Sequence, residues 1–397
     1  MPDAQPWWMD GAFGCGPEGL TLGGRAVAAE AAVHGTPLYL YDTAEVRRRA
    51  RLLKQALAAT GLEHRVHFAM KSNRFGPVLD ALRAERDVGI DACSPREVAL
   101  ALRHGFAPAE ISVTASMLAD RDLDAFAAAR VHLNLDSRSA LRRWAARVPR
   151  GTPVGLRVDP GVAVGYGDDP RVAYGRSKFG LLPETVEQVA AEAQALGLVV
   201  DTLHVHGGWG LPASALPAMQ RTFAMLAALA ERLPPVETLN VGGGLGARRR
   251  ASDEPLGLPA WSDALRTAFG RWGGRIACEP GTLLVDWAGV LLVQVNTVEN
   301  KDGVTWLGVD AGHNVNVYAA HYGIPVEIVH VARPLAAADT ICSVAGNINE
   351  SNDVFARGIA LPRVAEGDLL AFLPAGAYGS SMSSDHCLRG FAAEVAW

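Results

Sequence analysis

Eight short apolar runs, separated by longer amphipathic segments, fill the middle of this chain, and this alternation constrains the fold more than any other feature. The runs hold four to six residues each, whereas the segments between them repeat their apolar residues at helical spacing. Eight strands that alternate with helices over roughly 240 residues predict a (β/α)8 barrel, a TIM-like α/β fold. The alternative, a doubly wound open sheet, more often stops at about five or six strands. The expected strands are Arg65–Met70, Val88–Ala92, Ile111–Thr114, His132–Leu135, Val154–Val158, Thr202–Gly207, Thr238–Gly242 and Arg275–Cys278. The expected helices include Ala44–Ala59, Pro95–His104, Leu118–Ala129, Glu184–Leu196, Leu216–Arg232 and Ala260–Gly270.

The pattern changes after Pro280, where Gly, Pro and Asp turns separate short strand-like runs and no long helical pattern occurs. We therefore expect a second domain that is all-β or nearly so. Two early runs, Leu20–Leu22 and Leu38–Tyr41, are candidates for further strands of that domain. The predicted division is a barrel at residues 42–281 and a β domain formed by residues 1–41 and 282–397. The later expected strands are Gly289–Val298, Val304–Val309, Pro325–Val331, Thr340–Val344 and Asp368–Leu373.

Composition excludes several classes of protein. A net charge of -5 gives no reason to expect nucleic acid or an anionic membrane as partner. No apolar run approaches the roughly 20 residues that span a bilayer, and the first residues do not form a signal peptide. The five cysteines are scattered, which argues against a disulfide scaffold or a structural zinc site. We expect a cytoplasmic protein without a metal.

Lys71 is the first candidate for chemistry, because it follows an expected strand and catalytic residues of barrels cluster at the carboxyl ends of strands. A lysine amine in such a place forms an imine with an aldehyde cofactor when its surroundings favour the neutral amine. The alternative is an ordinary lysine that extends into solvent. The chain has only three other lysines, Lys54, Lys178 and Lys301, so few residues compete for this role.

Two further strand ends carry groups that suit a phosphorylated aromatic cofactor. Gly242–Gly244 follow the seventh expected strand, and consecutive glycines expose backbone N–H groups that bind anions. Barrels often bind phosphate in the loops after strands seven and eight, although three glycines are also a common turn. Glu279 ends the eighth strand, where a carboxylate can pair with a protonated pyridine nitrogen.

His204 and His206 form a His-x-His pattern at the end of the sixth expected strand. Alternate residues of a strand share one face, so the pair is a possible metal site, but no clear third ligand is apparent. A buried, hydrogen-bonded histidine is the simplest interpretation of either residue. A third is that His206 stacks on an aromatic cofactor, which suits a cavity that also binds phosphate.

Together these elements resemble the fold-type III pyridoxal-phosphate decarboxylases, which include diaminopimelate, ornithine and arginine decarboxylases. The resemblance runs from about Pro37 to the C-terminus and is strongest to diaminopimelate decarboxylases, through the stretch that begins at Gly376. It implies an alanine-racemase-like arrangement, with a β-sandwich or β-barrel-like domain after the barrel. The motifs that carry the resemblance are Phe68–Asn73, Asp91–Ser94, Ser177–Gly180, His206, Gly242–Gly246, Glu279–Gly281, Glu350 with Ser351 and Asp353, and Gly376–Ser384.

The resemblance also implies roles for single residues. Lys71 would be the Schiff-base lysine of pyridoxal 5′-phosphate, His206 would stack on the pyridine ring, and Glu279 would meet the ring nitrogen. Gly243, Gly244 and Tyr378 would bind the phosphate, and the strand-end residues Asp91 and Arg157 are further candidates for the cofactor site. Members of the family are head-to-tail homodimers in which the segment around Glu350 reaches the partner's active site. The stretch Gly161–Arg176 resembles their mobile lid.

Four positions depart from the family pattern. Asn349 stands where the family has a catalytic cysteine that assists reprotonation of the substrate carbon. Thr282 and Tyr318 stand where the family has arginines near phosphate and substrate, although Tyr322 keeps its place. Trp209 replaces a phosphate-binding serine. Arginine grips a carboxylate by bidentate hydrogen bonds, so the loss of two guanidinium groups weakens binding of a distal carboxylate.

We therefore expect decarboxylation of an amino acid other than diaminopimelate, in specialised metabolism. Thr282, Tyr318, Tyr322 and Glu350 are the expected substrate contacts, and Asn349 lies at the expected reprotonation site. His386 is a candidate acid or substrate contact, with an ordinary surface position as the alternative. Two other functions remain open. One is a racemase, epimerase or other carbanion chemistry on the same cofactor, and the other is a catalytically silent, decarboxylase-like regulator.

Overall fold

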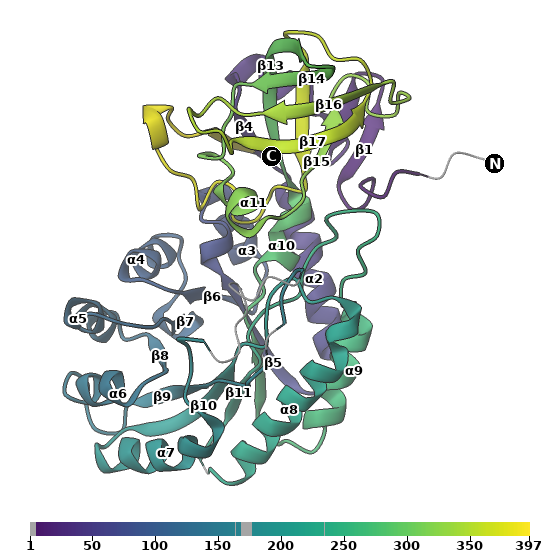
Figure 1. Cartoon of the computed structure of the whole chain (residues 1–397). Coiled ribbons are helices and arrows are strands. Elements are labelled where there is room, and N and C mark those ends of the chain that lie inside the picture. Colours follow the sequence, from purple (N-terminus) through teal and green to yellow (C-terminus); the bar gives the residue numbers. More distant parts are fainter. Residues whose placement is uncertain (1–4, 163, 168–176, 234) are drawn as a thin grey trace.

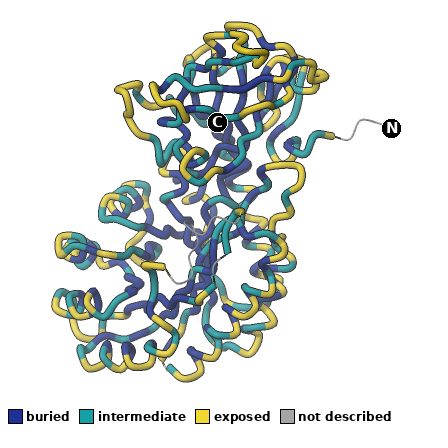
Figure 2. Tube along the Cα trace, in the orientation of Figure 1, coloured by how far each residue is buried: buried dark blue, intermediate teal, exposed yellow. Residues whose placement is uncertain are grey.

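The computed structural model describes residues 5–162, 164–167, 177–233 and 235–397. Two units are stacked in it: a barrel surrounded by helices lies below, and a β domain lies above one end of the barrel (Figure 1). Most of the stretch expected to form a lid, at positions 163 and 168–176, lies outside the described residues. The interior of both units is buried, whereas the outer helices and the loops of the β domain carry the exposed residues (Figure 2).

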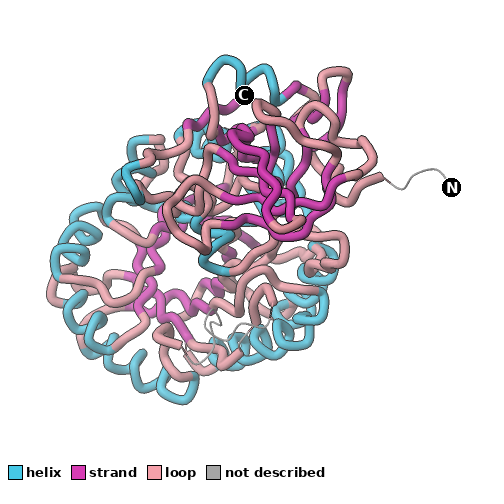
Figure 3. Tube along the Cα trace, turned by 45° about the horizontal axis from the view of Figure 1, so that its top comes forward, coloured by secondary structure: helices cyan, strands magenta, loops and turns pink. Residues whose placement is uncertain are grey.

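Eight parallel strands close into a barrel in which each strand pairs with its neighbours in the chain and the last pairs with the first. The prediction of a (β/α)8 barrel is thus confirmed. Figure 3 shows the strands as a ring with helices outside it. Every expected strand is present, with ends that differ by three residues at most. The strands are β5 (Glu63–Ala69), β6 (Val88–Ala92), β7 (Ile111–Thr114), β8 (His132–Leu135), β9 (Pro153–Val158), β10 (Val199–Val205), β11 (Thr238–Asn240) and β12 (Arg275–Cys278).

The barrel helices begin at capping residues that the sequence supplies. The Asp42 carboxylate accepts a hydrogen bond from the N–H of Ala44 at 2.9 Å, and Ser94 and Ser137 cap two further helices in the same manner. All six expected helices are present, and two short ones, α3 and α6, were not expected. The helices are α2 (Thr43–Ala58), α3 (Gly76–Ala84), α4 (Pro95–Arg103), α5 (Asp120–Ala129), α6 (Arg138–Ala145), α7 (Val186–Ala195), α8 (Leu216–Glu231) and α9 (Leu258–Phe269).

The β domain is built on one sheet with the order β15-β18-β13-β14-β16-β17, in which β4 also pairs with β13 and β19 pairs with β4. β4 comes from the start of the chain and β19 from its end, and they pair in parallel. All five expected strands after Pro280 are present, whereas β17 and β19 were not expected. The strands are β4 (Leu38–Tyr41), β13 (Gly289–Lys301), β14 (Val304–Val309), β15 (Glu327–His330), β16 (Thr340–Ala345), β17 (Val354–Leu361), β18 (Leu369–Leu373) and β19 (Ala393–Ala396).

The early run Leu20–Leu22 is a strand, but it belongs to a separate three-stranded sheet rather than to the main sheet of the β domain. This small sheet consists of β1 (Phe13–Gly16), β2 (Gly19–Leu22) and β3 (Arg25–Ala26), and α1 (Val27–His34) follows it. The N–H of Leu20 donates to the carbonyl of Val331 at 2.8 Å, which attaches the small sheet to the β domain. No helix in the described part of the chain is long and apolar enough to cross a membrane.

The β domain is joined to the mouth of the barrel by direct hydrogen bonds. The N–H of Tyr378 donates to the carbonyl of Ser72 at 2.6 Å, and the hydroxyl of Ser381 donates to the carbonyl of Lys71 at 2.8 Å. The side-chain amide of Asn73 donates to the carbonyl of Gly376 at 2.9 Å. The stretch around Tyr378 therefore fixes the backbone of the strand-end lysine.

Candidate active site

A cavity of about 440 Å³ lies at the carboxyl ends of the barrel strands, where the β domain covers the barrel mouth. Barrel residues from several strand ends form its floor, and residues from α11 (Val317–Tyr322) and the stretch after β18 form its roof. The floor includes Lys71, His206, Gly244, Leu245, Glu279 and Thr282, and the roof includes Tyr318, His321, Tyr322, Tyr378 and Met382.

Lys71 follows β5 in a short 3-10 helix, η1 (Met70–Ser72), and its side chain is one-third exposed to the cavity. Its Nζ lies 3.4 Å from Asp91 Oδ2 and 3.8 Å from Cys93 Sγ. Asp91 is fully buried, and burial together with the nearby charge of Glu279 raises its pKa well above the usual carboxyl range, although Lys71 acts in the opposite direction. Burial raises the pKa of the Cys93 thiol to about 12, so this group is a neutral thiol.

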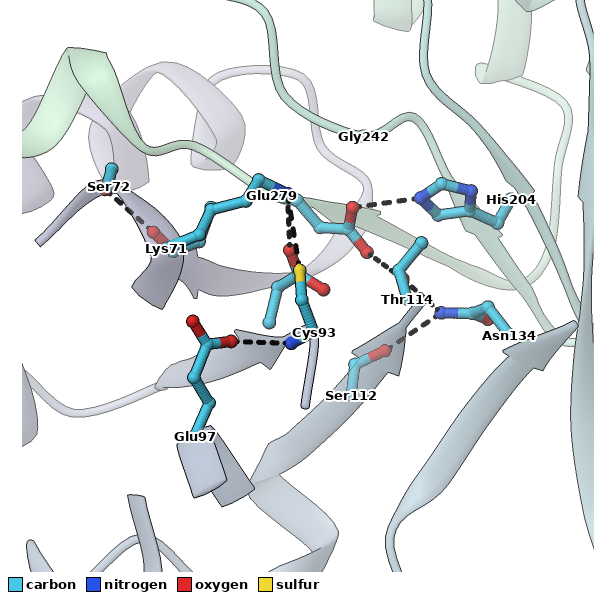
Figure 4. A network of polar contacts seen from close by, with 12 residues as sticks. Lys71, Ser72, Cys93, Glu97, Ser112, Thr114, Asn134, His204, Gly242 and Glu279 are labelled. Carbon is cyan, nitrogen blue, oxygen red and sulfur yellow. Dashed lines mark hydrogen bonds and ion pairs between the residues drawn. The ribbon is translucent and has the colours of Figure 1, made fainter. Parts of the chain in front are cut away.

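The carboxylate of Glu279 is hydrogen-bonded through both of its oxygens. Its Oε2 lies 2.9 Å from His204 Nε2, and its Oε1 accepts from Asn240 Nδ2 at 2.8 Å and from Thr114 Oγ1 at 3.1 Å. Asn134 in turn donates to Thr114 at 2.9 Å. Figure 4 shows Glu279, His204, Thr114 and Asn134 connected in this network, with Lys71 beside it.

This network determines the charge of Glu279. Burial alone would raise the pKa of the carboxyl group, but the interaction with His204, the hydrogen bond to it and the charge of Lys71 act in the opposite direction, and the net effect is a lowered pKa. The pKa of Glu279 therefore lies below its ordinary value. The cavity floor thus presents a fixed negative charge at the end of β12.

The two histidines of the His-x-His pattern have different surroundings. His204 is fully buried and contacts Glu279, which confirms the interpretation as a buried, hydrogen-bonded histidine. His206 lines the cavity, and its Nδ1 accepts a hydrogen bond from the N–H of Gly208 at 3.3 Å. Burial and the charges of Arg157 and Lys71 lower the pKa of His206, so its ring is neutral and suited to stacking. Within the described residues, no three His, Cys, Asp or Glu side chains are grouped to hold a metal.

The glycines after β11 pack too closely for side chains. Gly244 has a φ of +107° and lines the cavity, and a Cβ atom there would lie 2.5 Å from the carbonyl oxygen of Gly208. A Cβ on Gly243 would lie 2.3 Å from the carbonyl oxygen of Glu279. Gly243 faces a small pocket beside Cys278 and Pro280, so of these two glycines Gly244 is the one that borders the cavity.

Four further predicted site residues do not line the cavity. Arg157 is buried behind the cavity, with its guanidinium group 4.4 Å from the centre of the Phe179 ring. Asn349 and Glu350 are exposed and do not line the cavity of their own chain. His386, which is also exposed, lies beside Glu350, with 3.5 Å between Nε2 and Oε1.

Asp353 organises the loop that carries Asn349 and Glu350. Its buried carboxylate accepts from the N–H groups of His313 and Ile348, each at 2.7 Å. The loop is therefore held by internal hydrogen bonds, and its functional candidates lie outside the lining of the cavity. Sequence reasoning named Asp353 only as part of a motif.

Several cavity residues were not among the expected site residues. Lys178 and Phe179 line the cavity from a motif that the resemblance included without a role. His321 and Met382 also line it, and both lie close in sequence to expected residues, Tyr318 and Tyr378. Helical spacing from Tyr318 to His321 is a signal that could have identified the histidine.

Residues 43–286 match the family model described as "Pyridoxal-dependent decarboxylase, pyridoxal binding domain". The chain belongs to this decarboxylase family. A diaminopimelate decarboxylase of Methanothermobacter thermautotrophicus is 34% identical over 386 residues, which cover 95% of this chain and 90% of the relative. A diaminopimelate decarboxylase of Pseudomonas aeruginosa is 33% identical, over 94% of this chain and 90% of that relative.

Solved structures support the same family. Diaminopimelate decarboxylase from Helicobacter pylori, complexed with L-lysine, matches this pyridoxal-dependent decarboxylase with a TM-score of 0.86 and 25% identity, over 93% of each chain. A lysine/ornithine decarboxylase from Vibrio vulnificus shares the fold, with a TM-score of 0.79 and 21% identity over 94% of this chain and 97% of the other. The protein is a pyridoxal 5′-phosphate-dependent amino-acid decarboxylase.

The groups present in the cavity fit that cofactor. A primary amine, an ionised carboxylate and a partly buried neutral imidazole border one space, as an aldehyde-bearing pyridinium requires. Gly244, where no side chain can be placed, leaves room for a phosphate to approach the backbone.

Proposed function

We propose that this enzyme decarboxylates an amino acid other than meso-diaminopimelate. The observation that carries the proposal is that Thr282 and Tyr318 both line the cavity, at two positions where the resemblance implies arginines. A hydroxyl group cannot replace the bidentate hydrogen bonds and the charge that a guanidinium offers a carboxylate. A specialised metabolic role is part of the same proposal, as is a cytoplasmic location.

The bound cofactor supplies the electron sink that allows the α-carbon to lose carbon dioxide. We assign Lys71 as the residue that would attach the cofactor, while Glu279 would pair with the ring nitrogen and His206 would pack on the ring. Gly244 and Tyr378 border the cavity where a phosphate would lie. Asp91 Oδ2 lies 3.4 Å from the Lys71 amine, and burial raises the pKa of its carboxyl group, so we assign Asp91 to position that amine.

Absorbance and carbon dioxide release test this proposal together. Cofactor-loaded wild type should absorb visible light as a lysine-bound cofactor and release carbon dioxide from some amino acid other than meso-diaminopimelate. The Lys71→Ala variant should lose the band and lose activity by about 10²-fold or more. Lys301→Ala changes an exposed lysine of β13 and serves as the matched control. Efficient decarboxylation of meso-diaminopimelate, with kcat/KM of about 10⁴ M⁻¹s⁻¹ or above, would overturn the proposal.

A head-to-tail homodimer with shared active sites is a second part of the proposal. Asn349, Glu350 and His386 lie on the outer surface of their own chain, and Asp353 holds the loop of the first two in place. Such residues act on chemistry only if they reach another chain's cavity.

Mixing inactive variants tests the shared site. Lys71→Ala and Glu350→Ala chains, unfolded and refolded together, form mixed dimers in which one of the two sites is intact. Random pairing makes about half of the dimers mixed, and one of the two sites in each mixed dimer is intact. The activity averaged over all sites should therefore be about a quarter of that of wild type. No recovery, despite dimers of the correct mass, would show that each chain forms its site alone.

Racemisation is a second candidate function, because Asn349 is a poor proton donor at the position where the family has a cysteine. A racemase would exchange the α-proton for deuterium in heavy water without releasing carbon dioxide. Measuring both products from the same reaction separates the two functions, and no turnover of either kind would favour the silent regulator.

A further inference from the structure

Five aromatic rings form a continuous row that runs from the barrel to the roof of the cavity. The centroid distances are 6.2 Å from Tyr166 to Trp209, 5.2 Å from Trp209 to Tyr322, 5.4 Å from Tyr322 to Tyr318 and 4.8 Å from Tyr318 to Tyr378. Each distance lies in the range at which aromatic pairs attract each other. Four of the five rings, all except Tyr166, line the cavity.

The row joins the two structural units. Tyr166 and Trp209 follow barrel strands β9 and β10, whereas Tyr318 and Tyr322 lie on α11 and Tyr378 follows β18. Trp209 and Tyr318, two of the four departures from the family pattern, therefore meet through Tyr322. They are parts of one surface rather than separate changes, and they alter the same wall of the cavity.

The ring of Tyr318 packs against a buried arginine, Arg249. The guanidinium group of Arg249 lies 5.6 Å from the centre of the Tyr318 ring. Arg249 forms an ion pair with Asp286 at 2.5 Å and donates to the carbonyl of Pro374 at 3.0 Å, so its charge is already neutralised. Arg249 does not line the cavity, and the ring of Tyr318 does.

The position of the Trp209 ring is also restricted by close packing. A Cβ atom on Gly210 would lie 2.8 Å from Tyr166 Cβ, and a Cβ on Gly165 would lie 2.9 Å from Trp209 Nε1. The hydroxyl of Tyr166 donates to Asp253 at 2.8 Å. The indole is therefore fixed between Tyr166 and Tyr322, and a fixed ring provides a defined contact surface at low entropic cost.

In the part of the chain that the structure describes, few cations line this cavity. Among the described residues, the lysines that line the cavity are Lys71 and Lys178, and no arginine does. Lys178 is exposed, with Nζ 5.0 Å from the centre of the Phe179 ring. A hydrated lysine at an opening binds a carboxylate less firmly than a buried, bidentate arginine. Thr282 and Met382, which also border the cavity, are uncharged.

We infer that the substrate is an amino acid whose side chain ends in an uncharged aromatic or apolar group, which packs against Trp209, Tyr318 and Tyr322. The inference rests on the proposed decarboxylation and names the substrate class for it. The distal end of such a side chain needs apolar contact and no counter-ion, and the ring row supplies that contact.

A substrate panel tests the inference. Carbon dioxide release is measured with phenylalanine, tyrosine, tryptophan, leucine and methionine, and with glutamate, lysine, ornithine and meso-diaminopimelate, in both enantiomers where they exist. The best uncharged side chain should exceed the best charged one in kcat/KM by about 10-fold or more. A charged side chain in first place would overturn the inference and leave decarboxylation itself intact.

Binding is measured in parallel, as the change in cofactor absorbance on addition of each amino acid. If no carbon dioxide appears, the proposed decarboxylation fails, and the order of binding still decides the substrate class. Tighter binding of the charged set would overturn the inference.

Two variants test whether Trp209 and Tyr318 contact the substrate side chain. Trp209→Leu should raise KM for the preferred substrate about 10-fold or more while the cofactor band stays unchanged. Trp272→Leu, at the opposite end of the barrel, is the matched control and should not alter KM. Tyr318→Arg should shift the preference toward side chains that end in a carboxylate. An unchanged preference in both cavity variants would contradict the assigned role.

Discussion

His204 lies 2.9 Å from Glu279, and neither side chain has more than 2% of its surface exposed. The sequence placed these residues in two separate motifs, and the structure makes them one unit. A buried carboxylate costs a large free energy unless it is paired and hydrogen-bonded, and His204, Asn240 and Thr114 provide those bonds. The charge that a pyridinium nitrogen would meet is thus maintained from below the cavity floor.

The His204→Phe substitution removes the hydrogen bond to Glu279 and keeps a ring of similar volume at this position. We expect a loss of about 1.5–3 kcal/mol in the free energy of unfolding at pH 7 and weaker cofactor binding. Because the pKa of Glu279 is lowered in the folded state, its stabilisation is present above the ordinary carboxyl pKa of about 4.3 and is lost as pH falls below it. The difference between wild type and variant should therefore shrink in acid. Denaturant titrations at several pH values measure it, with His132→Phe as the control.

His67 should make the wild type sensitive to mild acid. Burial lowers its pKa to about 4, so between pH 6.5 and 4 the unfolded chain takes up a proton that the folded chain does not. The contribution of His67 to the free energy of unfolding is complete above pH 6.5 and falls by on the order of 3 kcal/mol by pH 4. His67→Gln should make this part of the curve shallower but not flat, because the pKa of His206 is lowered as well, whereas His34→Gln, at an exposed position, should leave it unchanged. Identical curves for all three proteins would disprove the assignment.

The loss of one partner from the buried ion pair of Arg249 and Asp286 should lower the free energy of unfolding strongly. Asp286→Asn leaves the guanidinium unpaired behind Tyr318, and we expect a loss of about 3–5 kcal/mol in the free energy of unfolding. Glu187→Gln breaks an exposed pair with Arg232 and should cost at most about 1 kcal/mol. Chemical denaturation compares the two, and equal effects would argue against a special role for the buried pair.

Gly243→Ala should damage the cofactor site without touching a cavity side chain. The new Cβ would lie 2.3 Å from the carbonyl oxygen of Glu279, so the backbone directly after β12 must shift. We expect about 10-fold weaker binding of pyridoxal phosphate, measured by absorbance titration. Gly273→Ala adds a methyl group where no atom lies within 4 Å, and it should bind the cofactor as wild type does.

The sequence was sufficient for elements with strong periodic patterns and insufficient for contacts between distant segments. The expected strands of the barrel are all present, because each apolar run lies between clear helical patterns. β17 was not expected, since only its last residue, Leu361, is buried and its residues give no alternation of buried and exposed positions. The Trp209–Tyr322 contact depends on how α11 lies over the barrel, and no local pattern encodes that packing.

The same limit applies to the site residues. Lys71, His206 and Glu279 follow strands, so topology alone places them at one end of the barrel. Asn349, Glu350 and His386 follow from resemblance only, and the structure of one chain leaves them away from its cavity. Their predicted roles await the mixed-dimer experiment.

The bond from Ser381 to the Lys71 carbonyl joins residues 310 positions apart. A ribosome that has finished the last barrel strand has not yet made Tyr318, Tyr378 or Ser381. The nascent chain therefore reaches a stage at which the cofactor lysine is present but its backbone lacks these anchors and the cavity lacks its roof. Secure enclosure of the cofactor must be a late event in the biogenesis of this enzyme, after the C-terminal residues have left the ribosome.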